Sequence, residues 1–69
     1  MRRYIVAVAD FDNYTNHISY FEAENDLDAI RKALEIRFGS IVWTLDKEDI
    51  DHFCMDDRMI VNAVEVELT

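Results

Sequence analysis

The chain has 69 residues, a formal net charge of −8 and an apolar fraction of 51%. This length supports a single domain over residues 1–69, and the apolar fraction is too high for a disordered chain. The negative charge opposes direct binding to nucleic acid or to an anionic membrane, and no apolar run approaches the roughly 18 residues that a membrane span needs.

The first third of the chain is predicted to form two strands joined by a short turn. Residues 3–11 are rich in β-branched and aromatic side chains and are apolar on both faces, which is typical of a central strand. Residues 12–16 include Asp, Asn and Thr, whose side chains bond to nearby backbone groups in turns. Residues 17–24 then return as the second strand of a hairpin.

An amphipathic helix is predicted over residues 26–38. Asn25 and Asp26 are both suitable N-cap residues, because their side-chain oxygens can accept hydrogen bonds from free backbone N–H groups. Apolar residues recur three or four positions apart and form one stripe, made of Leu27, Ile30, Leu34 and Phe38 with Ala33 alongside. Gly39 is the single glycine of the chain and stands where a helix end favours a positive φ.

The remaining elements complete the predicted fold. Residues 40–45 are predicted to form a short strand or an extended connector that buries Ile41 and Trp43. Residues 58–67 alternate between two apolar faces and are predicted to be the last strand. We expect this strand to lie beside the first one. The result is an α+β fold of order β-β-α-(β)-α-β, a small antiparallel sheet with helices packed on one face.

Residues 46–57 are predicted to form a short second helix. Ile50, Phe53 and Cys54 have helical spacing, and Asp46 can cap the helix. Cys54 lies on the apolar side, so we expect a buried structural cysteine. Since it is the only cysteine, no internal disulfide can form, and a reducing cytoplasm is the expected location.

A second apolar sheet face follows from this layout. Helices on one side can cover only one face, whereas the first and last strands are apolar on both. The side chains expected on the second, exposed face are Tyr4, Val6, Val8, Met59 and Val61. A patch of this kind often marks an interface. The alternative is that the second helix or residues 40–45 cover it.

The acidic side chains of residues 46–57 carry most of the net charge. Six acids minus one base, Lys47, give this segment a charge of −5. Such a run can imitate the phosphates of a nucleic acid or dock on a basic groove, and the alternative is a solvated helix face. The residues that would contact a partner are Asp46, Glu48, Asp49, Asp51, Asp56 and Asp57, with Tyr14 of the turn as an aromatic anchor.

A metal site is the other interpretation of this segment. On a helix, Glu48 and Asp49 lie four and three residues before His52, and carboxylate with imidazole can bind zinc or manganese. However, there is no second histidine nearby and no cysteine pair. The chain also lacks a glycine-rich loop that could hold a phosphate. We therefore expect no metal, no cofactor and no catalytic residue.

Part of the chain resembles small acidic accessory proteins of tailed bacteriophages. Those proteins combine a helix entry of the form VEAE-x-x-x-EAI-x-KA with a C-terminal strand. The matching residues here are Phe21-Glu22-Ala23-Glu24, Ala29-Ile30 and Lys32-Ala33. The layout is also similar to that of a phage inhibitor of bacterial RNA polymerase with a β-β-α-β fold. It is similar too to the partial ferredoxin-like fold of HicB-type antitoxins, whose glycine- and cysteine-containing motif is absent here.

The resemblance implies a protein that binds a host protein in the bacterial cytoplasm. The leading hypothesis is a non-enzymatic acidic binding protein, phage-encoded, that inhibits or modulates a nucleic-acid-handling or defence enzyme with a basic surface. The second hypothesis is a self-assembling structural or antitoxin-like protein that acts as a homodimer through a sheet face or strand edge. The third is an enzyme or small metal-binding protein that uses Glu48, His52 and a neighbouring aspartate.

Overall fold

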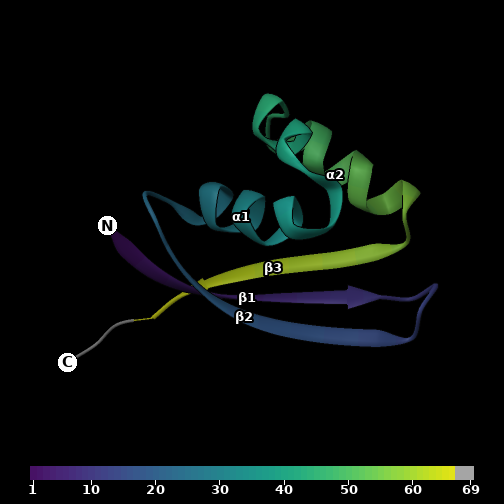
Figure 1. The fold of residues 1–69 in the computed structure, drawn as a ribbon, viewed down its shortest axis with the longest axis horizontal. Coiled ribbons are helices and arrows are strands. Elements are labelled where there is room, and N and C mark those ends of the chain that lie inside the picture. The colour runs from purple at the N-terminus through teal and green to yellow at the C-terminus, as the bar shows by residue number, and fades with distance from the viewer. Residues whose placement is uncertain (67–69) are drawn as a thin grey trace.

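The structure, a computed structural model, describes residues 1–66. The elements in chain order are β1 (Arg2–Asp10), β2 (Thr15–Ala23), α1 (Asp26–Phe38), the 3₁₀-helix η1 (Ser40–Thr44), α2 (Lys47–Asp56) and β3 (Met59–Glu65). The strands form an antiparallel sheet of order β2-β1-β3, and the helices lie together on one side of it (Figure 1). The predicted α+β fold is confirmed, including the position of the last strand beside the first.

The hairpin of β1 and β2 is organised by its turn. The Asp10 carboxylate accepts hydrogen bonds from the backbone N–H groups of Asp12 and Asn13, at 3.1 and 3.3 Å. Tyr14 closes the turn with a φ of 54°. The turn is shorter than predicted, so β2 begins at Thr15 rather than at residue 17.

Helix α1 begins and ends as its sequence predicts. The Asn25 side chain is the N-cap and accepts a hydrogen bond from the Asp28 N–H at 2.8 Å. Gly39 has a φ of 80° and donates its N–H to the Glu35 carbonyl at 2.9 Å. Leu34 is fully buried at the centre of the apolar stripe, and Ala29 beside the stripe is also fully buried. Because Ala29 packs in one cluster with Ala23 of β2, α1 can approach the sheet closely.

The segment after α1 differs from its prediction. Residues 40–45 do not form a strand or an extended connector, since Ser40–Thr44 is a 3₁₀-helix that buries Val42 and leaves Ile41 and Trp43 exposed. The Trp43 indole N–H donates to the Glu35 carboxylate on α1. Three consecutive apolar side chains point in three directions on so tight a helix, so only one of them can reach the core.

Helix α2 covers the end of the sheet next to β3. Asp46 is its N-cap and accepts a hydrogen bond from the Asp49 N–H at 2.8 Å, as predicted. Ile50 and Cys54 are buried against Leu34, Val42 and Met59. The predicted helix over 46–57 and the predicted buried cysteine are both confirmed.

The sheet face that the helices cover is the one predicted to be exposed. Tyr4, Val6 and Met59 are buried, and Val8 and Val61 are half-buried in the two core clusters. The hypothesis of an exposed face made of these five residues was therefore wrong. The alternative holds for part of this face, because Val42 of η1 and Ile50 and Cys54 of α2 lie in one core cluster with Met59, and Val8 and Val61 pack against it. The strand predicted over residues 58–67 spans Met59–Glu65, and residue 67 lies outside the described residues.

Candidate functional site

The acidic surface of α2 is formed by the six acids singled out in the sequence. Asp57, at the C-terminal end of the helix, is half-buried. The other five are exposed: Asp46, Glu48, Asp49, Asp51 and Asp56. At 3.6 residues per turn, these side chains spread around the outer side of α2 instead of forming one narrow stripe. A broad acidic surface can approach a concave basic partner from several angles.

The basic residues of the chain do not neutralise this surface. All five arginines pair with carboxylates that lie outside it, in the pairs Arg2–Glu65, Arg3–Glu22, Arg31–Asp28, Arg37–Asp10 and Arg58–Asp12. Lys32 donates to the Glu22 carbonyl. Lys47 is therefore the one base of residues 1–66 that lies on α2, and the surface keeps its negative charge.

Tyr14 lies at the end of the molecule where α2 ends. Its side chain is almost fully exposed. The hairpin turn contacts the turn after α2, because the Phe11 N–H donates to the Arg58 carbonyl at 3.1 Å and Arg58 pairs with Asp12 at 3.6 Å. The structure thus brings the turn that carries Tyr14 beside the C-terminal end of the acidic surface, whereas Asp46 lies at the opposite end of the helix.

The groups considered for chemistry remain separate. Within residues 1–66, no set of three or more His, Cys, Asp or Glu side chains is arranged to hold a metal ion. Burial, together with the negative charges of Asp51 and Asp57, raises the pKa of the Cys54 thiol. A buried thiol with a raised pKa is a poor nucleophile at neutral pH.

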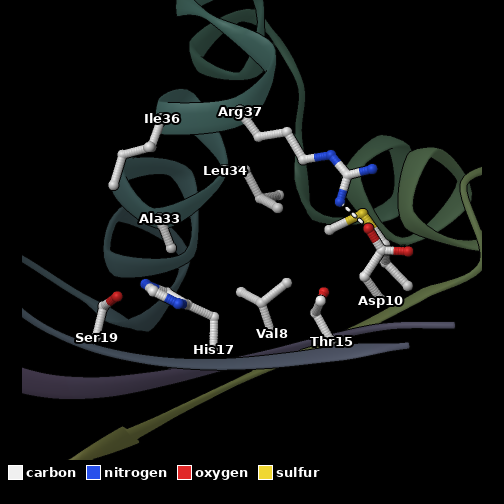
Figure 2. A pocket seen from close by; sticks show the side chains of 10 residues that line it. Val8, Asp10, Thr15, His17, Ser19, Ala33, Leu34, Ile36 and Arg37 are labelled. Atoms are coloured by element: carbon white, nitrogen blue, oxygen red, sulfur yellow. Dashed lines mark hydrogen bonds and ion pairs between the residues drawn. The ribbon is translucent and has the colours of Figure 1, made fainter. Parts of the chain in front are cut away.

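One pocket lies between β1, β2 and the second half of α1. Figure 2 shows Ser19, His17, Val8 and Thr15 rising from the strands toward α1, with the Arg37–Asp10 ion pair at one end. The full lining is Val8, Asp10, Thr15, His17, Ser19, Ala33, Leu34, Ile36, Arg37 and Met59. The polar residues Thr15, His17 and Ser19 line the pocket from β2. Apolar residues such as Val8, Leu34 and Met59 line it elsewhere.

The size and the charges of this pocket limit what it can hold. Its volume is about 160 Å³, below the roughly 300 Å³ at which small-molecule sites begin. The Asp10 carboxylate already accepts from Arg37 and Asn13. The charges of Asp10 and Arg37 therefore satisfy each other, and the pocket has room for about one side chain.

The opposite face of the sheet carries no helix and is apolar. The strand register places three cross-strand rows on it: Tyr20–Ile5–Val64, Ile18–Ala7–Asn62 and Asn16–Ala9–Ile60. Its large apolar side chains are exposed: Ile18 by 72%, Ile60 by 59%, Val64 by 57%, Tyr20 by 53% and Ile5 by 41%. We call this surface, together with the Arg3–Glu22 pair at one end, the open face.

Sequence reasoning identified an exposed apolar sheet face but assigned it to the wrong residues. In β2 the alternation of Ile18 and Tyr20 with His17 and Ser19 suggests that the isoleucine and tyrosine face the core. The signal that indicates the observed side is Ala23, because a small residue just before a helix permits close packing on that face.

Comparisons with known proteins give no relative. No protein family, no curated protein and no solved structure matches the chain. Within residues 1–66, no helix has the length and apolar character that crossing a membrane requires.

Proposed function

We propose that this chain is a non-enzymatic binding protein that docks the acidic surface of α2 on a basic surface of a partner protein. The pairing pattern is the observation that carries the proposal. Five arginines each pair with a carboxylate elsewhere, and five of the six acids of the acidic surface are exposed to solvent. A basic partner would supply the missing positive charge, and such complementarity favours fast and specific association.

The chemistry of the acidic surface favours one class of partner. Enzymes that handle nucleic acid have basic grooves that neutralise phosphates. Carboxylates spread around a short helix can occupy such a groove in place of phosphates and so block it. The resemblance to accessory proteins of tailed bacteriophages favours a bacterial enzyme of this class, acting in nucleic-acid handling or defence, and inhibition or modulation of it in the cytoplasm. Tyr14, beside the end of α2, is the aromatic anchor of the proposed interface.

The test compares three forms of the tagged chain as bait in a bacterial lysate. The first is the wild type. The second, E48Q/D49N/D51N/D56N, removes four charges from α2 and keeps the Asp46 cap. The third, E22Q/E24Q/D26N/E65Q, removes four acids that lie elsewhere on the surface. Circular dichroism establishes that all three are folded.

We expect a basic protein to be retained by the wild type and by the third form at low salt, and to be released at high salt. The α2 variant should not retain this protein even at low salt, because its substitutions remove the charges that high salt screens in the wild type. Retention of the same protein by the α2 variant would contradict the proposal. Equal loss from both variants would also contradict it, because net charge alone would then control binding.

A further inference from the structure

We propose that the open face is the interface of a homodimer in which the sheets of two copies pack face to face. This inference is independent of the acidic surface of α2, which lies in the helical layer on the other side of the sheet (Figure 1). It uses the five large apolar side chains that the fold leaves exposed on the open face.

Charge is the first argument for a second copy as the occupant. The chain has a net charge of −8, so two copies repel each other over most of their surface. The charged side chains of the open face are Arg3 and Glu22, which lie opposite each other in the register, 3.9 Å apart between Nε and Oε1. The open face is therefore neutral, and two copies can meet there without bringing like charges together.

The same neutrality disfavours a charged partner at this surface. A basic protein is attracted to the acids of α2, and the open face offers no net field to guide it. A largely apolar face with no net charge is complementary to another face of the same kind. Each copy brings one cation and one anion, so the Arg3–Glu22 pair is compatible with an isologous contact.

The size of the open face is the second argument. From Arg3 to Ala9 it extends about 20 Å along the strands, and its three strand axes span about 10 Å. Its exposed Ile, Val and Tyr side chains present on the order of 500 Å² of accessible surface. The smallest specific interfaces bury about 600 Å² on each partner. The area beyond the apolar side chains can come from Asn16, Asn62 and the Arg3–Glu22 pair.

Sheet packing explains how the contact would be made. Two sheets pack with their faces about 10 Å apart when aliphatic and aromatic side chains interdigitate. The open face has small residues, Ala7 and Ala9, on the central strand and larger ones, Ile18 and Ile60, on the outer strands. Side chains of one outer strand can therefore pack over the alanines of the other copy. A small single domain also gains stability from such burial.

The test measures the mass of the full chain in solution over a range of concentrations by light scattering after size exclusion. The variant I18K/I60K places two lysines on the open face. The control I36K/M55K places two lysines on the helices, where Ile36 is 77% and Met55 72% exposed. Both variants change the net charge from −8 to −6, so general repulsion is reduced equally.

We expect the wild type and the control to form a dimer of twice the 8.2 kDa chain at high micromolar concentration. I18K/I60K should raise the dimer dissociation constant at least about 100-fold, since two charges from each copy would be buried in an apolar contact. Salt should strengthen the wild-type dimer, because it screens the repulsion between the copies. Salt should have the opposite effect on the complex with a basic partner, which it should weaken.

Two results would overturn the inference. The first is a wild type that stays monomeric at high micromolar concentration, which would leave the open face to a different protein. The second is a dimer that persists in I18K/I60K, which would place the contact elsewhere, for example at the backbone edge of β2. In that second case, loss of the dimer in I36K/M55K would place the contact on the helices. Circular dichroism establishes that each variant is folded.

Discussion

Asp10 links three parts of the molecule through one buried side chain. Its carboxylate accepts from the turn residues Asp12 and Asn13 and from Arg37 on α1. The hydrogen bond from the Asn13 side chain, and next the one from Arg37, lower the pKa of Asp10 from 3.8 to about 2. A charged Asp10 is therefore bound more strongly in the folded state than in the unfolded state.

We predict that Asp10→Asn makes stability less sensitive to acid. Because the folded pKa is the lower one, the contribution of Asp10 is fully present above the unfolded value of 3.8 and is lost as the pH falls toward about 2. Asp10→Asn should lower the melting temperature at pH 7 and flatten its decrease between pH 4 and pH 2. Melting curves over this pH range measure both effects. Asp12→Asn, at an exposed acid of the same turn, is the control and should follow the wild type. Parallel profiles for the wild type and Asp10→Asn would refute the assignment.

At the scale of elements, the two helices are held by their ends. Asn25 and Asp46 each accept a backbone hydrogen bond at 2.8 Å in the first turn. Phe38, at the end of α1, packs edge-to-face on Phe53 of α2, with ring centroids 4.7 Å apart. Arg31 of α1 donates to the Leu45 carbonyl just before α2. The position of the acidic surface therefore depends on helix caps and on a few contacts between the helices.

We predict that Asp46 stabilises α2 as a cap and not through its charge. Asp46→Ala should lower the free energy of unfolding by about 1 kcal/mol, because the Asp49 N–H loses its acceptor. Asp46→Asn keeps a side-chain acceptor and should cost no more than a few tenths of a kcal/mol. Urea denaturation measures both values. Each substitution removes one negative charge, so equal destabilisation by the two would show that the charge and not the cap is responsible.

At the scale of the whole molecule, charge and apolar surface are on opposite sides. The helical layer carries the acidic surface of α2, and the open face carries exposed isoleucine, valine and tyrosine side chains with no net charge. The acidic residues near one another repel and oppose the compact state. The same arrangement leaves a neutral apolar surface on a strongly acidic chain.

We predict that salt raises the melting temperature of the wild type, since screening reduces this repulsion. The variant E48Q/D49N/D51N/D56N should show a smaller rise, because it removes charges that have no arginine beside them. The variant E22Q/E24Q/D26N/E65Q, of equal net charge, should keep more of the rise, because it also breaks the pairs of Arg2 and Arg3. Calorimetry at low and at high sodium chloride, at one protein concentration, measures the three responses. An unchanged rise in the α2 variant would contradict the prediction.

Local patterns in the sequence were sufficient for most of the elements. The caps at Asn25 and Asp46, the positive φ at Gly39 and the spacing of the apolar residues depend on a few neighbouring positions. Residues 40–45 were the exception, because β-prone side chains suit both a strand and a short 3₁₀-helix. The Trp43 contact with Glu35 belongs to the packing of that segment on α1.

The sequence by itself determined the α+β fold, the helix ends and the acidic surface of α2, because each follows from local spacing and from side-chain chemistry. Only the tertiary structure decided which face of the sheet is covered. The first and last strands are apolar on both faces, so the residue pattern of neither strand indicates which face the helices cover. That choice depends on where α1 packs after β2, and the small pair Ala23 and Ala29 lets it lie over Tyr4 and Val6. The side chains on the open face, Ile18 and Ile60 among them, are left exposed as a result.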